Sequence, residues 1–214
     1  MLYSLRFFLV YFIVKFWFLK NVEIKAIGLG NVPKNQGFII VSNHDHSYDP
    51  HLISVSLKKH VHFLAIDRGY KRSLFRKKWL SELERLVFKD SILGFLLRLL
   101  QQIPVSYSDK LMNKKALLSA SNLLRKKRII GIFPEGVIEQ EQKNKKIFPG
   151  VAILAKRSNA KILPIYVWTN APCDSFLKPN FTKAKINIGK PLNFARSINH
   201  TKKNIMKRIY SLKK

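Results

Sequence analysis

The sequence predicts a single α/β domain with a mainly parallel central sheet flanked by helices, preceded by an apolar N-terminal helix. Short apolar runs rich in β-branched residues alternate with segments of helical periodicity. The chain has 214 residues and is 47% apolar, which is enough for one sizeable core. No internal repeat, linker-like segment or low-complexity tract divides it.

The expected strands are runs of β-branched and aromatic residues bounded by turn residues. In chain order they are VEIKAIG (22–28), GFIIVS (37–42), VHFLAI (61–66), IPVS (103–106), RIIGIF (128–133), KILPIYVW (161–168) and KINIG (185–189). The segment LGNVPKNQ (29–36) between the first two contains glycine, proline and asparagine, which is typical of a turn.

Helical patterns occupy the segments between these strands. The expected helices cover residues 50–57, 79–100, 110–127, 149–157 and 202–212. Because strands and helices alternate, crossover connections and a mainly parallel core sheet are favoured. We expect residues 22–214 to form the domain.

The first 21 residues are expected to form a membrane-associating helix. The uninterrupted apolar run covers only residues 7–14, whereas a bilayer span needs about 20 residues. No small-residue cleavage site follows it, so a signal peptide fits poorly. Aromatic residues together with Arg6, Lys15 and Lys20 suit a headgroup-depth anchor on the cytoplasmic face of an anionic membrane, peripheral or monotopic. The alternative is an apolar helix packed on the domain itself.

The charge of the chain limits its partners without choosing among them. Forty Lys and Arg against twelve Asp and Glu give a net charge of +28. Such a field draws a protein toward nucleic acid, anionic lipid headgroups or a phosphorylated substrate. Since the lysines are spread along the whole chain, part of the excess is also compatible with compositional background. The single cysteine, Cys173, cannot close an intramolecular disulfide or supply a thiolate cluster.

The segment VSNHDHSYDP (41–50) concentrates chemically active side chains. Possible metal ligands are His44, His46, Asp49 and His51. Their spacing does not match the H-x-H-x-D-H arrangement of metallo-β-lactamase-like hydrolases, and the further ligands that such a site needs are missing. A metal-dependent hydrolase is therefore disfavoured, and no metal is expected.

The same segment also fits a general base with an orienting acid. His44 follows an expected strand at its carboxyl end, where open α/β sheets place their ligand crevices. Pro50 suits the first turn of a helix, so Asp49 falls at or next to its cap and can reach back to the imidazole. A carboxylate on one ring nitrogen leaves the other free to take a proton from a hydroxyl. The alternative is that Asp49 is only an N-cap and His44 only a surface residue.

A second block, IIGIFPEG (129–136), ends another expected strand. Phe133, Pro134, Glu135 and Gly136 put an acid and a flexible backbone turn at the edge of the sheet, where we expect them to face the same crevice as His44. A four-residue F-P-E-G segment alone is also a common turn.

These blocks, in this order, resemble those of the glycerolipid acyltransferase family, which includes the lysophosphatidic acid acyltransferases. NHDHSYD is similar to the family's N-H-x4-D block, IFPEG to its F-P-E-G block, and ILPIYV to its later proline-containing strand. The resemblance covers about residues 22–167.

The resemblance implies transfer of a fatty acyl chain from a thioester to the hydroxyl of a lysoglycerolipid, with 1-acylglycerol-3-phosphate giving phosphatidic acid. His44 would be the base, Asp49 its orienter, and residues 133–136 part of the acceptor pocket. The implied partners are an acyl thioester of coenzyme A or acyl carrier protein, the lipid acceptor and an anionic membrane surface, with no further cofactor. Nucleic acid is not expected, because no recognition scaffold is evident.

Two departures bear on the acceptor. The family carries arginine in a block similar to I-x-V-x-R and again shortly after F-P-E-G, where this chain has Tyr107 and Ile138. A planar bidentate donor suits a phosphate, so these absences leave a different, non-phosphate lipid acceptor as the alternative. Other cations could replace the arginines or form a solvated face instead: Arg68, Lys71, Arg72, Lys143, Lys145 and Lys146.

Overall fold

The computed structural model describes residues 12, 15–16, 19–66, 101–106, 108–136, 147–171, 179–195 and 197–213. Its strands are β1 (Glu23–Ile27), β2 (Phe38–Ser42), β3 (Val61–Ile66), β4 (Ile103–Val105), β5 (Ile129–Ile132), β6 (Lys161–Thr169) and β7 (Lys183–Ile188). Its helices are η2 (Leu29–Asn31, a 3-10 turn), α2 (Asp49–Leu57), α6 (Lys110–Arg125), α7 (Gly150–Ser158) and α8 (Ile198–Tyr210). All seven expected strands are present, whereas the expected helix over 79–100 lies outside the described residues.

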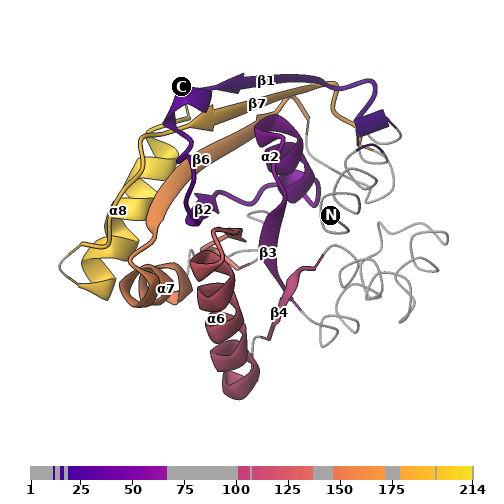
Figure 1. The fold of residues 1–214 in the computed structure, drawn as a ribbon. Coiled ribbons are helices and arrows are strands. Elements are labelled where there is room, and N and C mark those ends of the chain that lie inside the picture. Colours follow the sequence, from indigo (N-terminus) through magenta and orange to yellow (C-terminus); the bar gives the residue numbers. More distant parts are fainter. Residues whose placement is uncertain are drawn as a thin grey trace.

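The strands form one sheet in the order β1-β7-β6-β2-β5-β3-β4 (Figure 1). The five strands from β6 to β4 are mutually parallel, while β7 pairs antiparallel with β6 and β1 pairs parallel with β7. The expected mainly parallel α/β sheet is confirmed, with a reversed pair of strands at one side. Consecutive strands β1 and β2 are therefore far apart in the sheet.

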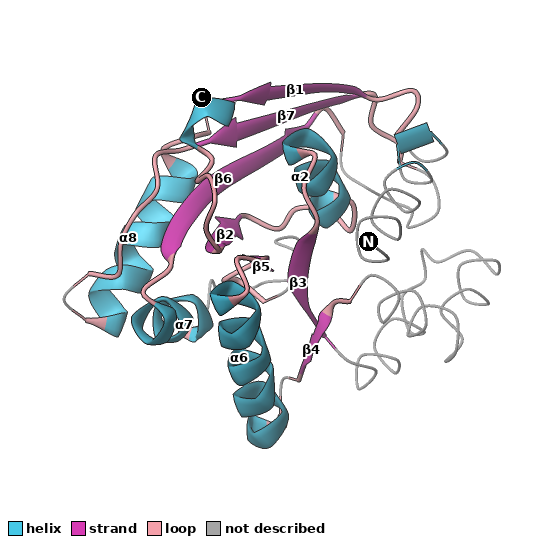
Figure 2. Ribbon diagram, in the orientation of Figure 1, coloured by secondary structure: helices cyan, strands magenta, loops and turns pink. Residues whose placement is uncertain are grey.

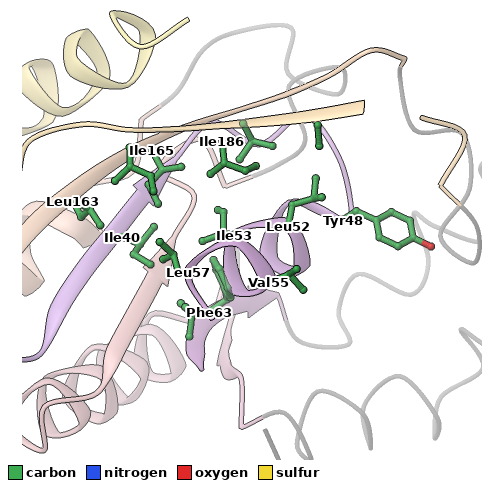
Figure 3. Packing of buried hydrophobic residues seen from close by; sticks show 14 of the residues in the cluster. Ile40, Tyr48, Leu52, Ile53, Val55, Leu57, Phe63, Leu163, Ile165 and Ile186 are labelled. Carbon is green, nitrogen blue, oxygen red and sulfur yellow. The ribbon is translucent and has the colours of Figure 1, made fainter. Parts of the chain in front are cut away.

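Two helical layers cover the sheet. Helix α2 lies on one face, and α6, α7 and α8 lie on the other (Figure 2). Every residue of β2 is buried because the strand is central and covered on both faces, which explains its continuous apolar run. Figure 3 shows Leu52 and Ile53 of α2 in one cluster with Ile40, Ile165 and Ile186 of the sheet.

The C-terminal helix begins earlier than its periodicity indicates. We expected it over 202–212, but α8 begins at Ile198. The Ser197 side chain caps the helix by accepting a hydrogen bond from the backbone amide of His200 at 3.2 Å. One side of α8 is buried against the sheet through Thr201, Ile205 and Ile209. Three of the four residues in the first turn, Asn199, His200 and Thr201, are polar, so apolar spacing alone did not reveal it.

Only a few of the first 21 residues are described. Leu19 is buried in the core on the α2 side, whereas Phe12 and Phe16 are exposed and stack with ring centroids 5.4 Å apart. Within the described ranges, no helix is long and apolar enough to cross a membrane. The division into an anchor over 1–21 and a domain over 22–214 stays a prediction.

Candidate active site

The site begins at the carboxyl end of β2, where buried Asn43 fixes the chain. Its amide nitrogen donates to the Val167 carbonyl at 2.9 Å, and its carbonyl oxygen accepts from the Val167 amide at 2.8 Å. The side chain thus continues the pairing of β2 with β6 beyond Ser42. A second bond from the Asn43 amide nitrogen to the Asp45 carboxylate, at 2.9 Å, supports the turn that follows.

His44 emerges from this turn and meets Asp49. The two are joined by a 3.0 Å bond between Nδ1 of His44 and Oδ2 of Asp49. The same oxygen accepts from the backbone amides of Asp45 at 2.8 Å and His46 at 2.9 Å. The Asp49 side chain is fully buried, while that of His44 is 18% exposed. Because an ionised carboxylate only accepts, Nδ1 carries the proton and Nε2 is the nitrogen left to take one.

Local sequence explains why Asp49 can reach the imidazole. It is the first residue of α2, and Pro50 follows in the first turn, where its missing amide proton is no loss. Tyr48 occupies the cap position without a side-chain cap bond. The Asp49 carboxylate is therefore not an ordinary N-cap. It accepts hydrogen bonds from the turn between β2 and α2 and so stabilises that turn.

The second part of the site follows β5. Val41 of β2 is in register with Ile132 of β5, so the residues after these two strands lie side by side. Oε2 of Glu135 accepts from the backbone amide of His44 at 3.3 Å, and Oε1 accepts from the hydroxyl of Tyr210 at 2.7 Å. Glu135 is only 3% exposed, so protein donors rather than bulk water satisfy its carboxylate.

The turn after Glu135 needs glycine. Gly136 has φ +76°, in the left-handed region, and a Cβ there would lie 2.7 Å from the Phe148 ring. The backbone around it is closed by bonds from Gly136 to the Phe133 carbonyl at 3.0 Å and from Phe148 to the Pro134 carbonyl at 2.8 Å. This closure holds the glutamate at the end of the strand.

Two stacked phenyl rings support the imidazole. The His44 ring stacks on Phe133 with centroids 4.0 Å apart, and Phe133 stacks on Phe63 of β3 at 5.4 Å. Gly131 of β5 makes room for this stack, since a Cβ there would lie 2.3 Å from the Phe63 ring. The carboxylate on Nδ1 and the stack on one face together restrict rotation of His44.

His46, in the same segment, and His51, directly after it, have surroundings separate from those of His44. Nε2 of buried His46 bonds to the Thr169 hydroxyl, which itself donates to the Ala171 carbonyl at 3.0 Å. Burial lowers the pKa of His51 to about 4. No group of three or more His, Cys, Asp or Glu residues within the described parts of the chain could hold a metal ion.

The structure therefore brings the two predicted blocks, His44 with Asp49 and residues 133–136, to one edge of the sheet. Sequence reasoning missed Asn43 as the anchor of the turn and Tyr210 as the partner of Glu135. Neither had a periodic signal, because both bonds cross between distant segments, 124 and 75 residues apart. Tyr107, Ile138 and the six alternative cations lie outside the described residues.

Comparisons with known proteins agree with this architecture. The model of the acyltransferase family matches residues 23–168. Among solved structures, the chain is similar to the 1-acyl-sn-glycerophosphate (LPA) acyltransferase PlsC from Thermotoga maritima, with a TM-score of 0.58 and 18% identity over 90% of this chain and 73% of that one. No curated protein matched significantly.

The matched range begins at β1 and ends one residue before the end of β6, so it contains both blocks of the site and the strands from β1 to β6. At 18% identity the likeness to the solved enzyme concerns the fold. The family expected from the two blocks is confirmed: the chain belongs to the acyltransferase family.

Proposed function

We propose that this protein transfers a fatty acyl chain from an acyl thioester to the hydroxyl of a lysoglycerolipid, with 1-acylglycerol-3-phosphate as acceptor and phosphatidic acid as product. The observation that carries the proposal is the 3.0 Å bond that holds partly exposed His44 against fully buried Asp49. Family membership and the fold shared with an LPA acyltransferase support the choice of substrate class.

His44 acts as the general base in this proposal. The acceptor hydroxyl oxygen attacks the thioester carbonyl while Nε2 takes the hydroxyl proton, so a C–O bond forms. The C–S bond then breaks, and the imidazolium returns the proton to the departing thiolate. Asp49 keeps Nδ1 protonated and stabilises the transient imidazolium. A thioester is already activated, so this proton transfer contributes about 10²–10⁴-fold and positioning supplies much of the rest.

Residues 133–136 form one wall of the proposed acceptor pocket. Phe133 and Gly136 are partly exposed and able to contact a lipid, whereas Pro134 and Glu135 are buried. Glu135 therefore contributes to catalysis by fixing the backbone of His44, whose amide donates to its carboxylate at 3.3 Å. The proposal requires no cofactor besides the thioester of coenzyme A or acyl carrier protein.

The acceptor and donor place the protein at a membrane surface in this proposal. Exposed Phe12 and Phe16 offer apolar contact, and the net charge of +28 favours anionic headgroups at the cytoplasmic face. Binding to vesicles with and without anionic lipid, at matched salt, tests this part separately from the chemistry.

The function is tested by following thiol release and lipid product together. Purified protein would receive an acyl thioester and lysophosphatidic acid in mixed micelles, with mass spectrometry identifying the diacyl product. His44→Ala should lose at least about 10²-fold in kcat while keeping the wild-type circular dichroism spectrum. Undiminished turnover by folded His44→Ala protein overturns the mechanism.

The acceptor is tested by a panel, because the arginines expected in the family are replaced by Tyr107 and Ile138. Lysophosphatidic acid, lysophosphatidylcholine and monoacylglycerol would be compared by kcat/KM with the same donor. The proposal expects lysophosphatidic acid to rank first. A higher kcat/KM with monoacylglycerol would instead establish an acceptor without phosphate.

A further inference from the structure

We propose that Tyr210, the last residue of α8, is a positioning residue: it holds the Glu135 carboxylate in place to accept the backbone amide of His44. The inference rests on the proposed function, since it concerns how the base is held for acyl transfer. The helix that supplies Tyr210 lies beyond residues 23–168, the range that matches the acyltransferase family.

The contact joins two groups that ordinarily interact strongly. The Tyr210 hydroxyl donates to Oε1 of Glu135 at 2.7 Å, a distance typical of a bond to an ionised carboxylate. The other oxygen of the same carboxylate receives the backbone amide of His44. Glu135 is thus a bridge with one end on α8 and the other on the turn that carries the base.

The phenol is held firmly enough to act as an anchor. Its ring meets Tyr166 of β6 edge-on, with centroids 6.1 Å apart and planes at 60°. Preceding Ile209 is completely buried, and the carbonyl of Leu212, just after the helix, accepts from the Asn187 side chain at 2.6 Å. The end of α8 is therefore tied to both β6 and β7 and does not rely on the glutamate for its position.

This arrangement gives Tyr210 an effect on chemistry without contact to the substrate. If the Tyr210 hydroxyl is removed, one oxygen of the buried Glu135 carboxylate loses a donor, and the Glu135 side chain is free to turn away from the His44 amide. The base then samples orientations that do not face the acceptor hydroxyl, which lowers kcat more than it raises KM.

The experiment compares Tyr210→Phe with Tyr166→Phe, which removes a hydroxyl from the same aromatic pair and keeps both rings. Tyr210→Phe should lower kcat about tenfold, as expected from loss of one charge-assisted hydrogen bond, with KM within about twofold. Tyr166→Phe should retain wild-type kcat. The double variant Tyr210→Phe/Glu135→Gln should be no slower than Glu135→Gln alone, because both changes break the same bridge.

A second readout does not depend on activity. The His44 backbone amide resonance, assigned by ¹⁵N NMR, should shift in Tyr210→Phe in the same direction as in Glu135→Gln and should not move in Tyr166→Phe. A Tyr210→Phe protein with unchanged kcat and an unchanged His44 amide resonance overturns the inference, even if its urea midpoint falls. Absence of acyl transfer by the wild-type protein would overturn the proposed function instead, and the NMR comparison would still decide the bridge.

Discussion

Replacing Asp49 with asparagine tests the charge of the residue that we propose as the orienting acid. Oδ2 accepts all three donors, from Nδ1 of His44 and the amides of Asp45 and His46, whereas buried Oδ1 has no hydrogen-bond partner. Asparagine can therefore put its oxygen where Oδ2 lies and its nitrogen where Oδ1 lies. The geometry of His44 is retained, and only the negative charge beside the imidazolium is lost.

The magnitude follows from the burial of the pair. An imidazolium and a carboxylate with charges about 4 Å apart attract by about 4 kcal/mol at an effective dielectric constant of 20. The difference between a charged and a neutral hydrogen bond gives a lower figure of about 1 kcal/mol. We therefore expect kcat to fall about 10²-fold, between these limits. KM should stay within about twofold, because Asp49 is fully buried and cannot touch the substrate.

The assay is initial-rate thiol release over a range of acceptor concentrations, with Asp45→Asn as the matched control. Asp45 lies in the same turn and its carboxylate accepts from Asn43, a bond for which asparagine keeps an oxygen, so its variant removes a carboxylate and retains the acceptor that supports the turn. Burying an unpaired amide nitrogen costs about 1–3 kcal/mol, so the assay temperature must lie below the midpoint of thermal unfolding. The reasoning is refuted if Asp49→Asn retains more than half of kcat, or if Asp45→Asn loses as much.

Three further predictions concern packing and stability. Gly131→Ala should destabilise the fold by about 1–3 kcal/mol and also lower kcat, because the added Cβ would displace the Phe63 and Phe133 rings on which His44 stacks. The control Gly150→Ala, whose added Cβ would face open space, should change the urea midpoint little. Equal urea midpoints for the two variants would contradict this prediction. Asn43→Ala should cost about 2–4 kcal/mol in urea unfolding, since both backbone groups of Val167 lose partners; a cost below about 0.5 kcal/mol would show that water replaces them. Burial holds the pKa of His51 at about 4, below its usual 6.5, so the folded protein binds this proton less readily than the unfolded chain. The free energy of unfolding should therefore fall as pH drops from 6.5 toward 4, by up to about 3 kcal/mol. In His51→Gln the urea midpoint should depend less on pH between 6.5 and 4 than in the wild-type protein. Parallel curves of urea midpoint against pH for the two proteins would contradict the low pKa of His51.

Several features of this protein are encoded in short stretches of sequence. The apolar runs that became the seven strands could be located because period and turn residues act locally. The bond between His44 and Asp49 was expected for the same reason: a strand end, a four-residue turn and Pro50 at a helix start leave the two side chains within reach. The motif blocks then indicated the acyltransferase family.

Other features depend on how the whole sheet is assembled. The pairing of β1 with β7 at the far side, the 3.3 Å approach of Glu135 to the His44 amide and the bond from Tyr210 to Glu135 each join distant segments. Sequence patterns determined which residues form strands and helices and that His44 and Asp49 lie within reach of each other, because those features depend on neighbours along the chain. Only the tertiary structure decided the strand order and the contacts of Glu135 with His44 and Tyr210, because these depend on the packing of every layer against the sheet.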